Sequence, residues 1–327
     1  MLAFRSMMDL SGNKKVRSEY VRRARILQGL GFFFAILALA SFMVLCYINY
    51  EANEQVRSSV LLRDSVVLSP KKKVSKKAPK KAVKGAEQKA DVSFVDKYLL
   101  RQIDFNTLQK ENPDFDLWLS YPESSLDFPV VMEREVGKYH YDMINFHGKW
   151  TGAGTPLIPK SPTGRDFRTL ILAHRMVNYW GEEDYLFSNL PNRWMDKETA
   201  LSHPYVYTYK DNKAFRWRIW TGLPVRGDDK IYQTPYAPMS KEYEDLISHV
   251  AAIAPYTIGE TPTSLTPTLM LSTCSRAADE VNIGRYCAVF VMDQIYDQKT
   301  GSLLYAADEV ASELWKIENE KIREGVL

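Results

Sequence analysis

Cysteine is scarce in this chain, with three in 327 residues. Cys46 lies inside an apolar run, which leaves Cys274 and Cys287 for the rest of the chain. Two cysteines cannot build a disulfide scaffold, although one bridge between them stays open. The sequence also lacks tight Cys/His ligand pairs and glycine-rich phosphate loops. We therefore expect neither a metal nor a cofactor.

Charge is missing from one long stretch, because no charged residue occurs between Arg25 and Glu51. At about 1.5 Å per residue, residues 26–50 can cross a hydrocarbon core of roughly 30 Å. A cleaved signal peptide is the alternative, since a small-x-small pattern ends at Ala40. However, apolar residues continue beyond it to Ile48, further than a signal sequence needs. We expect an uncleaved, single-pass transmembrane anchor.

The orientation of this segment follows from the distribution of basic residues near it. Only Arg57 and Arg63 lie close to its C-terminal side. Positive charge near a membrane segment marks the cytoplasmic side, so we expect a cytoplasmic basic tail over residues 1–25 and the rest of the chain outside the cell. The six basic residues close to the N-terminal side are Lys14, Lys15, Arg17, Arg22, Arg23 and Arg25.

Residues 51–92 are expected to be a Lys-rich extracellular linker. Within them, residues 70–90 contain nine lysines, two prolines and no aromatic residue. Such a segment cannot bury enough apolar surface to fold and is extended by its own charge. It is either a solvated spacer or a segment attracted to an anionic cell envelope. Its expected position outside the membrane argues against a nucleic-acid partner.

From residue 93 to 327 the composition is that of a folded domain. Short runs of β-branched and aromatic residues alternate with Pro, Gly, Asn and Asp turns, which predicts a mainly β fold, a barrel or a sandwich decorated by helices. Apolar spacing predicts helices over 94–106, 240–254 and 306–323. The expected strands are 117–121, 128–132, 169–172, 205–209, 215–223, 268–272 and 285–292.

Cys274 and His174 are the candidates for chemistry. Each ends an apolar strand-like run, LMLSTC and TLILAH, and each opens a polar loop. Reactive groups are commonly presented at such positions, and a cysteine nucleophile needs a base to move its proton. Cys287 lies inside the apolar run RYCAVFVM and is read as a small buried hydrophobe. The other histidines, His140, His147, His203 and His249, lack this strand-end placement.

The sequence LSTC at Leu271–Cys274, followed by Arg285, resembles the sortase signature of a strand ending in Thr-Cys, a loop and an arginine that opens the next strand. His174 resembles the strand-end histidine of that family, although Ala173 and Arg175 replace its usual neighbours. The segments 108–114 and 128–131 and the helix expected before the cysteine strand resemble class B sortases. The resemblance covers roughly residues 94–293 and implies a closed β-barrel.

The resemblance implies a cysteine transpeptidase with Cys274 as nucleophile, His174 as acid and base, and Arg285 as oxyanion stabiliser. Its implied partners are exported proteins with a C-terminal sorting signal and an amine acceptor, either a peptidoglycan precursor or a pilin lysine. The implied location is the cell membrane of a Gram-positive-type envelope. Two alternatives stay open: a membrane-tethered cysteine peptidase that transfers its acyl group to water, and a non-catalytic envelope assembly protein.

Overall fold

The computed structural model describes residues 14–68, 98–99, 101–122, 124, 126–161, 167–176, 186–233, 236–274, 284–300 and 302–306. The chain divides into two compact units, residues 1–53 and residues 54–327. The first unit contains most of helix α2 (Lys14–Val66), and the second contains the last turns of that helix and all other described elements.

In the described part of the chain, one helix is long and apolar enough to cross a membrane. Its candidate span is Ser18–Tyr47, with a mean hydropathy of 2.4, and none of its most apolar window is buried. The span overlaps the segment 26–50 that the sequence predicts as an anchor. Length and composition alone define this span, and a signal sequence near the N-terminus would satisfy the same criteria.

After α2, the described helices of the second unit are short apart from α7 (Lys241–Ile253), which begins where the sequence predicts. The hydroxyl of Ser240 caps α7 by accepting a hydrogen bond from the backbone N–H of Tyr243 at 3.1 Å. The others are α4 (Phe105–Glu111), α5 (Leu190–Trp194), α6 (Lys197–Ser202) and the 3₁₀ turns η2 (His140–Asp142) and η3 (Lys230–Tyr232).

Nine of the described strands of the second unit form one sheet that closes on itself. Its order is β11-β10-β8-β7-β3-β4-β5-β6-β9, and β9 pairs back to β10, so that eight of the described strands make a barrel and β11 extends its edge. The predicted β-barrel is confirmed. The barrel strands are β3 (Phe115–Ser120), β4 (Asp127–Met132), β5 (Leu157–Ile158), β6 (Arg168–Leu172), β7 (Tyr205–Lys210), β8 (Lys213–Arg226), β9 (Thr268–Cys274) and β10 (Gly284–Asp297), followed by β11 (Leu303–Ala306).

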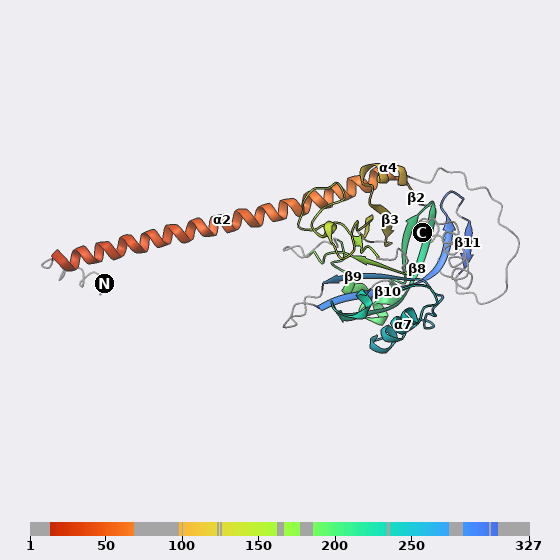
Figure 1. Cartoon of the computed structure of the whole chain (residues 1–327). Coiled ribbons are helices and arrows are strands. Elements are labelled where there is room, and N and C mark those ends of the chain that lie inside the picture. The colour runs from red at the N-terminus through yellow and green to blue at the C-terminus, as the bar shows by residue number, and fades with distance from the viewer. Residues whose placement is uncertain are drawn as a thin grey trace. The chain divides into compact units, whose positions relative to one another are not determined.

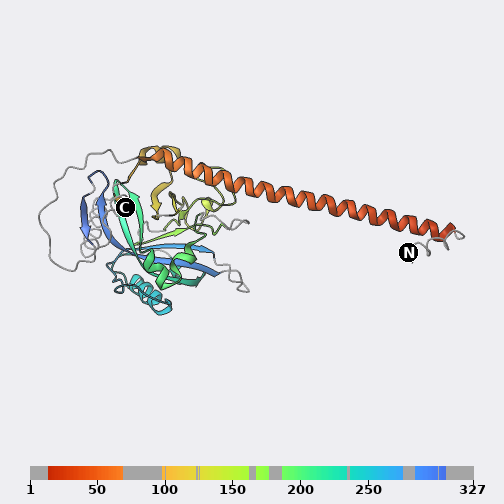
Figure 2. The ribbon, with the colours of Figure 1, turned by 180° about the vertical axis from the view of Figure 1, so that it is seen from behind.

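Strand alternation explains how the barrel packs. In β9, Leu269 and Leu271 join a buried cluster to which strands from all around the barrel contribute, whereas Met270 joins a second cluster with α7. Successive side chains of a strand point to opposite faces, so the first cluster fills the interior and the second covers the outside. Helix α7 lies beside β9 and β10 in both opposite views (Figure 1, Figure 2).

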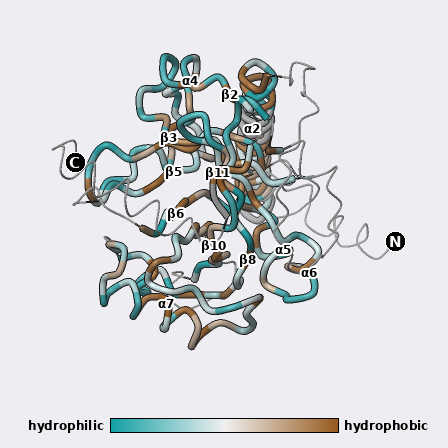
Figure 3. The backbone as a smooth tube through the Cα atoms, turned by 90° about the vertical axis from the view of Figure 1, so that its right-hand side faces the viewer, coloured by the Kyte–Doolittle hydropathy of each residue, from teal (hydrophilic) through white to brown (hydrophobic). Residues whose placement is uncertain are grey.

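A third buried cluster covers the outside of β3, β4 and β7. It includes Leu62 and Val66 from the end of α2 and Leu108 from α4. The tube coloured by hydropathy shows hydrophilic turns around α4 and hydrophobic stretches in the strands near β3 (Figure 3). The barrel therefore has one cluster inside and one on each of two outer faces.

Residues 51–66 differ from their prediction as a linker, because they continue helix α2. Val67 and Leu68 then form strand β1, which pairs antiparallel with β2 (Gln102–Ile103). The linker boundary expected at residue 51 is therefore wrong over residues 51–68. Leu62 and Val66, four residues apart on one helix face, are buried and tie this segment to the folded unit.

The helix predicted over 94–106 is also wrong in its second half. Residues 102–103 are in β2, and α4 begins only at Phe105, where Asp104 accepts the capping hydrogen bond from the N–H of Thr107. Residues 94–97 lie outside the described residues, as does the helix predicted over 306–323 apart from Ala306, which ends β11. The Lys-rich run 70–90 also lies outside them.

Candidate active site

Cys274 is the last residue of β9 and lies directly opposite Arg285, the second residue of β10. Directly opposed residues of an antiparallel pair point to the same face, with Cβ atoms roughly 5 Å apart. The thiol is half-buried. The ladder of β9 and β10 therefore brings together two of the three residues that the sequence analysis singles out.

His174 lies two residues beyond the end of β6, which runs parallel to β9. The last pair of that ladder is Leu172 with Ser272, so His174 and Cys274 each follow the pair by two residues. Two bonds hold these strand ends together: the hydroxyl of Thr273 donates to the carbonyl of Ala173 at 2.8 Å, and the N–H of Ala173 donates to the carbonyl of Ser272 at 3.2 Å.

One cavity of about 370 Å³ is lined by all three candidates. A cavity of this volume falls in the range of pockets that hold small ligands, so it has room for a short peptide segment. Its wall comes from the ends of β6, β9 and β10, the turn η2 and the region of η3. The lining residues are Tyr139, Asp142, Thr155, Leu157, Leu172, Ala173, His174, Gly227, Tyr232, Ser272, Thr273, Cys274 and Arg285.

Asp142 is the site residue that sequence reasoning missed. Its Oδ1 atom lies 3.1 Å from Nε2 of His174, and its backbone carbonyl oxygen lies 2.9 Å from the same nitrogen. The hydrogen bond to this carboxylate raises the pKa of His174, against an opposing effect of burial. In return, the hydrogen bond from His174 lowers the pKa of Asp142. The pair favours a charged imidazolium beside the cavity.

Arg285 supplies the other fixed charge of the cavity. One terminal nitrogen of its guanidinium donates to the carbonyl of Gly284 at 2.9 Å. Arginine has five N–H donors, so others remain for an oxygen bound in the cavity. On the neighbouring wall, the Tyr232 hydroxyl lies 2.7 Å from the Ser272 hydroxyl, and burial raises the pKa of Tyr232 well above its usual value.

Cys287 is fully buried in the cluster beneath α7, as the sequence predicts. Burial raises the pKa of its thiol to about 12, which keeps it neutral and unreactive at physiological pH. Cys274 and Cys287 are both free, so the bridge that the sequence leaves open does not form in this structure. Among these two cysteines only Cys274 faces the cavity.

The remaining histidines do not line this cavity. His249 pairs with Asp229 at 2.9 Å. The ring of His203 lies edge-on to Tyr121 and that of His140 edge-on to Tyr141. Each of these three histidines therefore makes a contact of its own, an ion pair or a ring contact, which supports a structural role.

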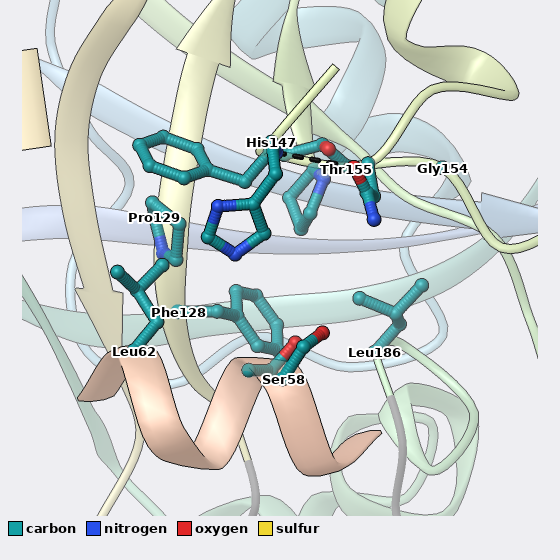
Figure 4. A pocket seen from close by; sticks show the side chains of 12 residues that line it. Ser58, Leu62, Phe128, Pro129, His147, Gly154, Thr155 and Leu186 are labelled. Carbon is teal, nitrogen blue, oxygen red and sulfur yellow. Dashed lines mark hydrogen bonds between the residues drawn. The ribbon is translucent and has the colours of Figure 1, made fainter. Parts of the chain in front are cut away.

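His147 lines a second, smaller pocket and pairs through Nδ1 with Glu111 at 2.7 Å. In Figure 4, Ser58 and Leu62 of α2 face Phe128 and Pro129 of β4 across this pocket. Its volume of about 20 Å³ is enough for a single water molecule and not for a peptide or an acyl group. No cluster of metal-ligating side chains occurs among the described residues.

Comparison with known proteins supports a relationship to sortases. The chain matches no profile of a known protein family. It is 23% identical over 175 residues to sortase B of Listeria monocytogenes, an alignment that covers 53% of this chain and 67% of that protein. The crystal structure of Clostridium perfringens sortase B matches with a TM-score of 0.50 at 20% identity, over 58% of this chain and 99% of the other.

A cysteine-to-serine mutant of the same Clostridium protein matches with a TM-score of 0.50 at 18% identity, over 57% of this chain and 85% of that one. The closed barrel with its few helices is the sortase B fold. The chain is thus similar in sequence and in fold to class B sortases, and this similarity supports a cysteine transpeptidase.

Proposed function

We propose that this chain is a membrane-anchored sortase. It cleaves a C-terminal sorting signal of exported proteins through a thioacyl intermediate on Cys274, and it passes the acyl group to an amine of a cell-wall precursor or a pilin lysine. The observation that carries the proposal is that Cys274, His174 and Arg285 line the same cavity. Their positions are determined by two strand ladders, β9 with β10 and β6 with β9.

In the first half-reaction the Cys274 thiolate attacks the scissile carbonyl carbon, and the carbonyl oxygen becomes an oxyanion. The guanidinium of Arg285, opposite Cys274 on the ladder, offers its charge and its remaining N–H donors to this oxyanion. The C–N bond then breaks, and the imidazolium of His174 gives its proton to the leaving amine. The products are a thioester on Cys274 and a neutral imidazole.

In the second half-reaction an amine attacks the thioester carbonyl carbon. His174 takes a proton from the incoming amine, the C–S bond breaks, and Cys274 leaves as a thiolate. Thiolate and imidazolium are thereby restored together. Asp142 supports this cycle because its carboxylate favours the charged imidazole that must be present before each acyl transfer to the cysteine.

The apolar helix at Ser18–Tyr47 supports a location at the membrane. On the charge distribution, the short tail is cytoplasmic and the barrel is outside. An exported substrate with a membrane-bound sorting signal and a lipid-carried acceptor would both meet the enzyme at that surface.

The test is transfer of a peptide to an amine by the full chain in detergent. Sorting-signal peptides of varied sequence are incubated with and without an oligoglycine or a lysine-containing acceptor, and the products are identified by mass. We expect an amide product and, after quenching, a thioester adduct on Cys274. Hydrolysis without transfer at saturating acceptor would support the tethered peptidase instead. No adduct with any peptide, and no labelling of Cys274 by a thiol-directed vinyl sulfone, would support a non-catalytic role.

A further inference from the structure

The contact between Asp142 and His174 indicates which ring nitrogen of His174 carries the hydrogen when the ring is neutral. Nε2 of His174 lies 2.9 Å from the backbone carbonyl oxygen of Asp142 and 3.1 Å from its carboxylate. A carbonyl oxygen only accepts hydrogen bonds, so Nε2 must carry the hydrogen. The other ring nitrogen, Nδ1, has no hydrogen-bond partner among the described residues. The contact therefore assigns the neutral ring to the form protonated on Nε2.

We propose that Asp142 is a positioning residue that holds the His174 ring with Nε2 protonated, so that Nδ1 is the nitrogen that exchanges protons with the thiol and the substrate amines. This inference rests on the proposed function for its consequence in turnover. Its geometric part, the protonation of one ring nitrogen, does not depend on the identity of the substrate.

The turn that carries Asp142 is held on both sides of the preceding residue. The backbone N–H of Tyr141 donates to Oε1 of Glu133 at 2.8 Å, and the carbonyl of Tyr141 accepts from the N–H of Thr155 at 2.9 Å. Glu133 is 1% exposed, so this anchor is not exchanged for water. The phenolic hydroxyl of Tyr141 adds hydrogen bonds to Asp114 and Asn112. These hydrogen bonds fix the turn to the barrel wall. A carboxylate can orient a histidine only if its own backbone is held in place in this way.

Gly154 allows the turn to come this close to the site. A Cβ atom at this position would lie 2.1 Å from the Asp142 carbonyl oxygen and 2.6 Å from that of Tyr141. Its φ of +62° also lies in the region that favours glycine. A side chain here would push away the carbonyl that accepts from Nε2.

Electrostatics in the cavity support a charged role for Asp142. The carboxylate raises the pKa of His174, and the positive charge of Arg285 lowers it by a smaller amount. The titratable and charged groups that face His174 from the walls of the cavity are Tyr139, Asp142, Tyr232, Cys274 and Arg285. Among the described residues that line the cavity, Asp142 is the one carboxylate.

The first measurement is the titration of His174 in the full chain in detergent, with ¹³C- and ¹⁵N-labelled histidine. A Cys274→Ala background removes the thiol, and a His174→Gln variant identifies the signal among the five histidines. We expect the ¹⁵N shifts of the neutral ring to report a proton on Nε2. We expect Asp142→Asn, which keeps size and an acceptor oxygen, to make His174 titrate at lower pH. Glu111→Gln is the matched control, since it removes a carboxylate from His147 instead.

The second measurement is turnover in the Cys274 protein. Substitution of the aspartate in a buried catalytic triad costs about 10⁴-fold in rate; Asp142 is half exposed, so we expect a loss of about tenfold in kcat for Asp142→Asn, with KM nearly unchanged. Asp142→Glu should recover part of the loss, and Glu111→Gln should have none. Gly154→Ala should reduce kcat as well and also disturb the Nε2 protonation.

Three results would overturn the proposal. These are a neutral His174 ring protonated on Nδ1, a titration of His174 unaffected by Asp142→Asn, and faster turnover of that variant, which would mean that the contact holds the ring away from the thiol. If no peptide is turned over at all, the NMR titration still decides the geometric part. Failure of the proposed function and failure of this inference are therefore distinguishable.

Discussion

The end of helix α2 provides a prediction that the sequence alone does not suggest. Leu61 and Leu62 are neighbours in this helix, but Leu61 is 62% exposed and Leu62 is 7% exposed within the cluster that covers β3, β4 and β7. Substitution of each by alanine removes the same atoms from the same helix. Only the Leu62 change removes buried contacts.

The expected magnitudes follow from this difference. Removal of a buried leucine side chain costs about 2–4 kcal/mol, made up of lost transfer free energy and the cavity left behind. For a unit of this size each kcal/mol lowers the midpoint of thermal unfolding by about 2–4 °C. We therefore expect Leu62→Ala to lower the midpoint by roughly 4–16 °C. We expect Leu61→Ala to change the unfolding free energy by less than about 0.5 kcal/mol.

Tryptophan fluorescence reports the unfolding of the second unit, which contains the barrel. All seven tryptophans follow residue 117, so none lies in α2. Urea and thermal unfolding of the full chain in a mild detergent, followed by this signal, should separate the two variants. Equal midpoints for Leu61→Ala and Leu62→Ala would refute the packing of α2 against the barrel. A protein that begins at residue 92 lacks this packing entirely and should unfold earlier still.

Other predictions concern the site directly. Cys274→Ala should abolish thioester formation, whereas Cys287→Ala should spare it and lower stability by about 1 kcal/mol or more through the cavity it leaves; equal loss in two folded variants, seen by mass spectrometry, would contradict a single nucleophile. Arg285→Lys should reduce kcat/KM at least about tenfold despite its charge, because the ammonium lacks the planar fork of donors, and near-normal turnover would remove Arg285 from the mechanism. The raised pKa of His174 and the lowered pKa of Asp142 predict that their pairing stabilises the fold most between about pH 4 and 6.5 and less as pH rises through the raised pKa of the histidine. The difference in unfolding free energy between the parent and Asp142→Asn should therefore shrink from pH 6 to pH 9, and a difference that grows over this range would contradict the ion pair.

The strand-end positions of Cys274 and His174 were predictable from local pattern. Each apolar run alternates or is continuous over a strand length and ends at the candidate residue, and the two ends meet because β6 and β9 are paired in parallel. Arg285 was predictable only through its place after the cysteine loop in the sortase resemblance. The roles of the three residues in catalysis stay predictions until variants are measured.

Asp142 was not predictable, because nothing near it in the sequence marks a site. It reaches His174, 32 residues away, through a short turn held by Glu133, Thr155 and the close approach at Gly154. These are tertiary contacts between segments that have no common pattern. The same reason explains the helix wrongly expected over 94–106, where residues 102–103 pair with the distant strand β1. Tertiary pairing overrides helical spacing in such a short segment.

The linker boundary was missed because the apolar residues of the segment 51–66 are interspersed with five charged ones and show no strong helical spacing. Burial of this segment depends on Leu62 and Val66 alone, since its other described side chains are exposed or partly exposed. Two apolar residues four apart are a weak periodic signal in a window that contains several charged side chains. That residues 51–66 form a packed helix becomes clear only once the apolar surface over β3, β4 and β7 is known.

The antiparallel pairing of β9 and β10 has a consequence for how this type of enzyme can diversify. Cys274 and Arg285 are opposite one another on a ladder that continues for six further pairs down to Thr268 and Val291. Their spacing is thus determined by the sheet and not by the residues 275–283 that join them in sequence. Changes of length or sequence between the two strands can therefore accumulate without separating Cys274 from Arg285.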